Sequence, residues 1–240
     1  GLKEREIEPL KRALDSMAPK SDAAFTQALA DIVSADNDKA AAACYALARY
    51  PRSEKAFDAL CRTALQPRDL NIRCSAINSL RSFHDFSPAK MCDQIVKQDE
   101  EQLVNTVLNL ISGNQFSGFE NALLLAAEHS SSYIRRQAVE ILGNARATDA
   151  EKAVIKMAEY DRDSGVRDAA LCALARMRSP EGLALCQGLL RSGDRNNKHR
   201  AWRSLSLWGD DPDAVDGMQK YKNDPDIGRQ ITDHLNRYAK

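Results

Sequence analysis

The sequence lacks the features that define several large classes of protein. Its 240 residues contain no apolar run of roughly 18 residues or more, so no transmembrane helix and no membrane insertion are expected. Only 6% of the residues are aromatic, and glycine and proline number 11 and 8, a balance that favours helices over a β-sandwich. The 34 basic residues are balanced by 34 acidic ones, whereas a dedicated nucleic-acid binder usually carries a basic excess.

Motifs of catalysis and of metal binding are missing as well. The chain contains no G-x-x-x-x-G-K-[ST], no H-E-x-x-H and no G-x-S-x-G. Its histidines are scattered and do not suggest converging metal ligands: His84, His129, His199 and His234. We therefore expect a protein that is not an enzyme, with no catalytic residue, no metal site and no cofactor.

A repeat with a period of about thirty-one residues runs through the chain. Its anchor positions are Lys39, Ile72, Leu103, Ile134, Val166, Asn197 and Ile227. Four residues later come mostly small apolar residues, namely Ala43, Ala76, Val107, Ala138, Ala170, Ala201 and Ile231. Eight residues after the anchors come larger ones, namely Leu47, Leu80, Ile111, Leu142, Leu174, Leu205 and Leu235. This spacing indicates one apolar stripe of a helix, with a small residue where a neighbouring helix comes close.

Each of these helices is expected to begin at a capping residue and to follow a second helix. The cap positions, three before the anchors, are Asp36, Asp69, Glu100, Ser131, Asp163, Asp194 and Asp224. The preceding helices are predicted over residues 23–33, 53–65, 88–97, 118–128, 149–159, 180–190 and 212–221. One such antiparallel pair cannot bury its apolar stripe alone, whereas a stack of pairs can. The prediction is an all-α fold, an α-solenoid of about seven helix pairs.

The two ends of the chain are expected to cap this stack. Ile7, Leu10, Leu14 and Met17 share one stripe of a predicted helix, so residues 1–20 are predicted to form an N-terminal capping helix. Because no linker or change of composition interrupts the rest, residues 21–240 are predicted to form a single domain. The chain begins with Gly1 rather than Met, which suggests that it is part of a longer protein.

The repeat resembles the HEAT-repeat family, in a short form similar to the repeats of phycobilisome lyases. The resemblance rests on the pattern D-x-x-[VI]-R-x-x-A-x-x-x-L, which reads here as Asp163, Val166, Arg167, Ala170 and Leu174. It weakens where Lys39 and Asn197 replace the apolar anchor, and where Val104 replaces the arginine. The resemblance implies a concave surface lined by the second helix of each pair, and such surfaces bind protein segments.

The six cysteines, Cys44, Cys61, Cys74, Cys92, Cys172 and Cys186, fall among apolar residues of the predicted helices and form no C-x-x-C. A cysteine that shares a repeat column with Leu and Val is expected to be a small buried hydrophobe. One reactive thiol, or disulfides, are the less favoured alternatives. A chain of this length can bury a large core without disulfides, so we expect a cytoplasmic, reducing location.

The segment 195–203 is the most basic stretch and surrounds Trp202. Residues 135–203 contain 14 Lys or Arg and 9 Asp or Glu. A basic surface with an aromatic side chain suits nucleic acid, and some HEAT-like DNA glycosylases use one. Trp202, however, shares a repeat column with Leu171, so core packing explains it. Nucleic-acid binding through the face of 135–203, including a glycosylase-like form of it, is therefore the alternative, and the neutral total charge argues against it.

One residue after the anchor, four repeats carry a cation: Arg73, Arg135, Arg167 and Lys198. The resemblance places these side chains in or near the concave groove. They can form a ladder with acidic residues such as Asp161 or Asp168, or they can recognise carboxylates of a bound peptide. Together with Arg200 and Arg203 they form the candidate partner-binding set.

The function predicted from these observations is a non-catalytic protein-binding scaffold that presents a concave helical surface to a protein or peptide partner. It is expected to be a monomer. Besides nucleic-acid binding, the repeat type leaves a second alternative, the lyase-like handling of a small molecule. The step from fold to function is an analogy, because no site chemistry in the sequence names the partner.

Overall fold

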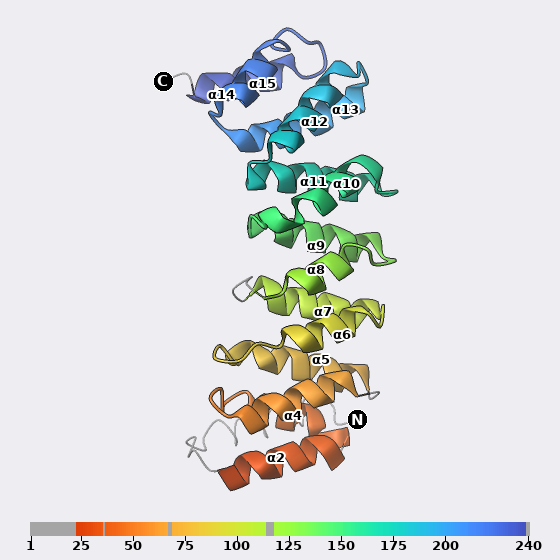
Figure 1. Ribbon diagram of the computed structural model, residues 1–240, viewed down its shortest axis with the longest axis vertical. Helices are drawn as coiled ribbons and strands as arrows, with labels where there is room; N and C mark the ends of the chain where they lie inside the picture. The colour runs from red at the N-terminus through yellow and green to blue at the C-terminus, as the bar shows by residue number, and fades with distance from the viewer. Residues whose placement is uncertain (1–22, 36, 67–68, 114–117, 239–240) are drawn as a thin grey trace. The chain divides into compact units, whose positions relative to one another are not determined.

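The computed structural model describes residues 23–35, 37–66, 69–113 and 118–238. The predicted capping helix over residues 1–20 lies outside these described residues. Within them the chain is helical and contains no strand, which confirms the all-α prediction (Figure 1). The α-helices are α2 (Ala23–Ala35), α3 (Asn37–Leu47), α4 (Glu54–Leu65), α5 (Leu70–Ser79), α6 (Ala89–Val96), α7 (Glu101–Ser112), α8 (Glu120–Ala126), α9 (Ser132–Asn144), α10 (Glu151–Tyr160), α11 (Ser164–Met177), α12 (Pro180–Arg191), α13 (Arg195–Leu205), α14 (Pro212–Gln219) and α15 (Gly228–Tyr238).

The helix starts follow the predicted capping chemistry at three of the seven cap positions. The carboxylates of Asp69, Asp163 and Asp194 accept hydrogen bonds from backbone N–H groups in the first turns of α5, α11 and α13. Glu100 and Ser131 make no such bond with their side chains, so the cap prediction is wrong at these two positions. Where a cap forms, it satisfies a backbone donor that would otherwise lack a partner.

The predicted apolar columns form the core. All seven residues that follow the anchors by four positions are buried, with at most 4% of the surface of each residue exposed. Six of the seven residues at the next column are buried, and Leu235 is half-buried. Burying one large aliphatic side chain contributes roughly 1.5–3 kcal/mol, so these columns are a main source of stability.

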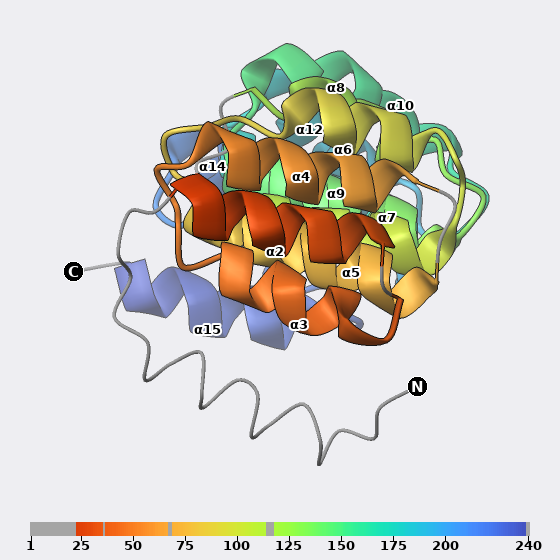
Figure 2. The ribbon, with the colours of Figure 1, turned by 90° about the horizontal axis from the view of Figure 1, so that it is seen from below.

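The described chain falls into two compact units, one ending at Leu125 and the other beginning at Ala126. In the first unit α2, α4 and α6 pack in one layer, and α3, α5 and α7 pack in a second layer (Figure 2). In the second unit α9, α11 and α13 pack side by side, and α10, α12 and α14 precede α11, α13 and α15 in their pairs. The expectation that residues 21–240 form one domain stays a prediction.

The contact between α9 and α11 depends on a glycine. A Cβ atom built on Gly143 of α9 would lie 2.6 Å from both Cα and Cβ of Ala173 in α11. Two helices can approach this closely only where one of them has no side chain, so this position explains why glycine is used inside a helix.

Among the described residues, no helix combines the length and the apolar character needed to cross a membrane.

Candidate partner-binding site

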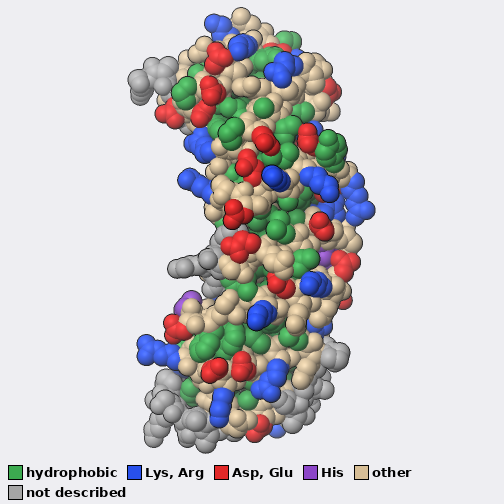
Figure 3. Space-filling model, in the orientation of Figure 1, with side chains coloured by type: hydrophobic (Ala, Val, Ile, Leu, Met, Phe, Trp, Pro, Cys, Tyr) green, Lys and Arg blue, Asp and Glu red, His purple; other side chains and the backbone are tan. Residues whose placement is uncertain are grey.

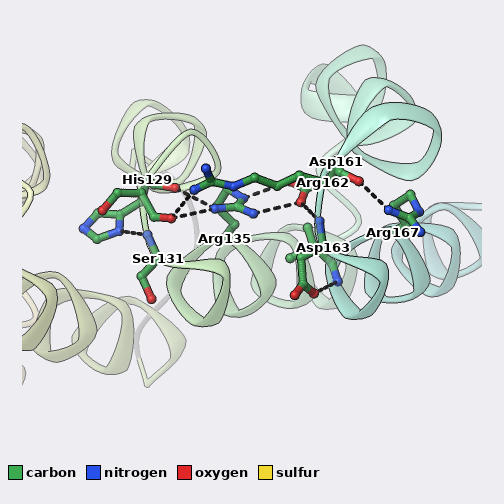
Figure 4. Close-up of polar contacts among 9 residues, drawn as sticks. His129, Ser131, Arg135, Asp161, Arg162, Asp163 and Arg167 are labelled. Atoms are coloured by element: carbon green, nitrogen blue, oxygen red, sulfur yellow. Dashed lines mark hydrogen bonds and ion pairs between the residues drawn. The ribbon is translucent and has the colours of Figure 1, made fainter.

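Arg135 of α9 reaches the loop before α11 and is almost entirely buried. Its Nε and Nη2 atoms donate to the two carboxylate oxygens of Asp161, at 2.8 Å each. Its Nη1 atom donates to the backbone carbonyl oxygens of His129, at 3.0 Å, and Ser130, at 2.9 Å. Only 6% of the Arg135 side chain and 8% of the Asp161 side chain are exposed. The guanidinium therefore ties the loop before α9 to the loop before α11 (Figure 4).

The electrostatics of this pair favour both charged forms. Burial alone would raise the pKa of the Asp161 carboxyl, but the hydrogen bonds from Arg135 and from the backbone N–H of Asp163 outweigh it, and the pKa lies below its ordinary value. The hydrogen bond to Asp161 raises the pKa of Arg135. Both side chains therefore keep their charges in the folded protein, and the ion pair is maintained.

Two further arginines contact the carbonyl oxygens of these loops. Arg162 donates from Nη2 to the carbonyl oxygen of Ser130 at 2.6 Å, and Arg167 of α11 donates from Nη1 to the carbonyl oxygen of Asp161 at 2.7 Å. Figure 4 shows Arg135 and Arg167 on opposite sides of Asp161. In the described residues Arg167 makes no other polar contact, so its Nε and Nη2 donors stay available.

Lys198 of α13 repeats the Arg135 arrangement two repeats later, beyond Arg167. Its Nζ atom lies 2.7 Å from an oxygen of Asp224 and 3.3 Å from one of Asp226, in the loop before α15. The hydrogen bond from Lys198 lowers the pKa of Asp224 and outweighs the effect of burial. The carboxylates of Asp161 and Asp224 each also accept a hydrogen bond from the backbone N–H two residues later, at 2.9 Å.

Arg73 of α5 occupies the same column in the first unit, but among the described residues it has no carboxylate partner. Its Nε atom donates to the carbonyl oxygen of Ala64 at 2.8 Å, and its Nη2 atom to Oε1 of Gln98 at 2.6 Å. Along this column, Arg135 and Lys198 therefore pair with carboxylates, whereas Arg73 donates hydrogen bonds to neutral oxygen atoms.

Three of the six predicted residues meet at one polar pocket of about 510 Å³ in the second unit. The pocket is lined by Arg167, Arg200 and Arg203 and by Asp168, Asp194 and Asn197, among others. Arg200 forms an ion pair with Asp168 through Nε and contacts Asn197 through Nη1. Arg203 lies 3.9 Å from Asp168, and 68% of its side chain is exposed. The structure thus brings Arg167, Arg200 and Arg203 together, whereas Arg135 and Lys198 are held by their own carboxylates.

The tryptophans divide between core and surface. Trp208 is buried, and the guanidinium of Arg178 lies 5.6 Å from the centre of its ring. Trp202 is half-buried, with its ring 5.4 Å from that of His234 in a T-shaped arrangement. Core packing therefore accounts for Trp208 fully and for Trp202 in part.

The cysteines are less uniformly buried than the sequence suggested. Cys44, Cys92 and Cys186 are buried, and Cys61, Cys74 and Cys172 are half-buried. Burial raises the pKa of Cys61 and of Cys92 to about 12 and that of Cys186 to about 11. Thiols with pKa values this high form little thiolate at neutral pH and react slowly. Over the described part of the chain, no group of three or more His, Cys, Asp or Glu side chains could hold a metal ion.

Stacked helix pairs, buried small-residue columns and inter-loop cation contacts define a helical-repeat protein. Residues 120–185 match the family model of HEAT repeats, so the resemblance stated from the sequence is confirmed, and this segment carries HEAT repeats. No curated protein matches the chain.

Among solved structures, the chain resembles the X-ray structure of YibA from Escherichia coli, with 15% identity and a TM-score of 0.57 over 100% of this chain and 93% of that one. The CpcE and CpcF complex of phycocyanin lyase from Nostoc sp. PCC7120 matches with 17% identity and a TM-score of 0.48, over 92% and 96% of the two chains. An engineered protein matches with 17% identity and a TM-score of 0.46, over 96% and 71%. At these identities the likeness concerns the fold alone.

A second pocket, which was not predicted from the sequence, lies between α10 and α12 and has a volume of about 750 Å³. Its walls include residues that belong to none of the predicted apolar columns, such as Ala184 and Leu189. One signal in the sequence could have indicated this pocket. It is a stripe of small and apolar residues along α12 that lie outside the core columns, namely Ala184, Gly188 and Leu189.

Proposed function

We propose that the protein is a non-catalytic scaffold that binds a protein or peptide partner through its second unit. The observation that carries the proposal is the meeting of Arg167, Arg200 and Arg203 at one pocket. Within the described residues, Nη2 of Arg200 and two nitrogen atoms of Arg167 have no hydrogen-bond acceptor. Donors left open beside a pocket suit a carboxylate or carbonyl oxygen supplied by a partner.

In this proposal the six predicted residues divide into two roles. Arg167, Arg200 and Arg203 contact the partner, and Arg135 and Lys198 hold the loops that position them. Arg73, which belongs to the first unit, serves the same supporting purpose there. A monomeric state is a further part of the proposal. The free, buried or half-buried thiols support its last part, a reducing, cytoplasmic location.

The distribution of charge supports a protein partner over nucleic acid. Asp168, Asp224 and Asp226 neutralise the cations of the basic stretch at close range. On the face drawn in Figure 3, Lys and Arg side chains are interspersed with Asp and Glu, and apolar side chains are exposed between them. Affinity for nucleic acid depends on many uncompensated phosphate contacts and falls steeply with salt. Binding to DNA or RNA near physiological salt is therefore expected to be weak.

A selection of random heptapeptides displayed on phage, with the purified protein as bait, tests the proposal. We expect enriched peptides whose binding decreases when Arg203 is changed to Glu, with Arg146→Gln as the matched control. Arg146 is exposed, belongs to the same unit and does not line the pocket. A failure to enrich any sequence, or binding that ignores Arg203→Glu, would contradict the proposal.

A further inference from the structure

The pocket between α10 and α12 has the size and the lining of a site for a large apolar side chain. Its volume of about 750 Å³ lies within the range of roughly 300–1,000 Å³ found for ligand sites. Its walls are formed mainly by Ile155, Ala158, Leu171, Leu185, Gly188 and Leu189. Four of these residues are half-buried, namely Ile155, Leu185, Gly188 and Leu189. The apolar lining is therefore accessible to a ligand.

The charged residues of this pocket lie at definite ends. Arg167 stands in the first turn of α11 and Arg200 in the second turn of α13, close to the short loops that follow α10 and α12. Glu181 lies in the first turn of α12, toward the opposite end. Glu159 and Tyr160, in the last turn of α10, are exposed at the rim. The end of the apolar pocket near these loops thus carries two guanidinium groups, with the exposed Glu159 carboxylate at its rim.

Arg167 and Arg200 also line the polar pocket of about 510 Å³. The two guanidiniums therefore separate an apolar space from a polar one. Ser164, Asn196 and Asn197 line the polar side, and their hydroxyl and amide groups can exchange hydrogen bonds with a peptide backbone. Because space continues on both sides of the guanidiniums, the pockets suit a chain that passes through them better than a chain that ends there.

We infer that these two pockets bind an internal segment of a partner protein in which a large apolar side chain is flanked by carboxylate side chains. This inference rests on the proposed function and names the chemistry of the partner. The apolar side chain fills the pocket between α10 and α12. A neighbouring carboxylate accepts hydrogen bonds from the open nitrogen atoms of Arg167 and Arg200, and the backbone continues into the polar pocket.

Fluorescence anisotropy with a fluorescein-labelled, C-terminally amidated peptide tests the inference. The probe is Gly-Ser-Asp-Phe-Asp-Ser-Gly, which has a carboxylate on either side of the phenylalanine. Replacement of both Asp by Asn, or of Phe by Ser, is expected to weaken binding at least about tenfold, because each removes one half of the recognition. The inference would be overturned if the three amidated peptides bound equally, or if only a peptide with a free C-terminal carboxylate bound.

Two variants of one residue test where the phenylalanine binds. A Cβ atom added at Gly188 would meet only Nη2 of Arg191, at 3.9 Å, so a side chain can be placed there without a clash near the backbone. Gly188→Trp should fill the pocket and abolish binding of the probe, and Gly188→Ala should retain it. Ala184→Trp, on the same wall and exposed, is the second blocking variant if Gly188→Trp melts earlier than the wild type. Full binding by both blocking variants would contradict the inference.

Changes at the guanidiniums complete the test. Arg200→Gln and Arg167→Gln should each weaken binding of the Asp-containing probe about tenfold or more while leaving the weak binding of the Asn-containing probe unchanged. Arg146→Gln is the control for general electrostatic attraction. If heptapeptide selection yields binders that depend on Arg203 but have no acidic and apolar residues, the scaffold proposal stands and this inference fails. If selection yields no binder, the proposed function fails first.

Discussion

Arg73 and Arg135 occupy the same position of the repeat in the two units, yet they are held in different ways. The Arg135 side chain is 6% exposed and donates twice to the carboxylate of Asp161, 26 residues later. Arg73 is half-buried and donates to the amide oxygen of Gln98, 25 residues later, and to a backbone carbonyl. The repeat pattern thus places the cation, and the loop residue one repeat later decides whether it acquires a buried charge partner.

Lys198 supports the same conclusion because its partner Asp224 also follows it by 26 residues. In both cases the acceptor belongs to the turn before the next second helix, and that turn is closed by a carboxylate-to-backbone hydrogen bond. The cation therefore links two consecutive turns of the stack. Where the loop offers Gln98 instead, the link is made by neutral hydrogen bonds.

The largest effect is expected at Arg135. The Arg135→Ala variant leaves the buried carboxylate of Asp161 without its partner, which typically costs about 3–5 kcal/mol of unfolding free energy. Urea denaturation followed by circular dichroism measures this loss. The matched control is Arg136→Ala, which removes an exposed pair with Glu140 and should cost at most about 0.5 kcal/mol. Equal losses in the two variants would show that burial of the Arg135 pair has no energetic consequence.

The Asp161 carboxylate should make stability depend on pH. Its pKa is lower in the folded protein than in the unfolded chain, so its contribution is complete above the unfolded value of about 3.9 and is lost as the pH falls through the folded value. The wild-type urea midpoint should therefore fall in acid. Asp161→Asn should have a lower midpoint at neutral pH and a flatter pH profile. Asp149→Asn, at an exposed residue of the same unit, serves as the control. Parallel profiles for Asp161→Asn and the wild type would contradict the account.

A smaller loss is expected at the equivalent position of the first unit. Arg73→Ala removes two hydrogen bonds to neutral oxygen atoms, and each such bond contributes about 0.5–1.5 kcal/mol at most when it is partly exposed. The loss should stay below that of Arg135→Ala when both are measured by urea denaturation under the same conditions. A loss of unfolding free energy as large as that of Arg135→Ala would contradict the distinction between the contacts of Arg73 and Arg135.

The smallest effect is expected when the contact of Arg73 is made to resemble that of Arg135. Gln98→Glu supplies Arg73 with a carboxylate of the same length, but the new ion pair is exposed to solvent. Such pairs contribute about 0.2–1 kcal/mol, so a small gain in the urea midpoint is expected at low salt and should disappear in high salt. A gain of several kcal/mol in unfolding free energy would indicate that charge alone, without burial, determines how much such a contact stabilises the protein.

The repeat columns could be predicted from the sequence because local and long-range requirements agree in them. Ala170 and Leu174 are apolar at helical spacing, and the same pattern returns in every pair, so a stack that buries one column buries all of them. The helix starts at Asp69, Asp163 and Asp194 followed from local capping chemistry. The cap function was misassigned at Ser131, where the side chain does not reach a backbone donor.

The candidate site could be predicted only in part. The sequence indicated the cations, but not which of them find intramolecular partners, because that depends on loop residues such as Asp161 and Gln98 in the next repeat. The pocket between α10 and α12 depends on how far apart these helices lie, which no local pattern encodes. Trp202 was expected in the core from its column, yet it is half-buried beside His234, because the column does not specify how completely the next repeat covers a side chain.

Hydrogen–deuterium exchange with mass spectrometry tests the central claim most directly, namely that a partner binds where Arg167, Arg200 and Arg203 meet. The protein is compared alone and with a saturating peptide obtained from the heptapeptide selection. Our account predicts slower exchange in residues 155–171 and 181–203, and unchanged exchange around Arg73. Protection confined to the first unit, or absent from both of the predicted segments, would contradict it.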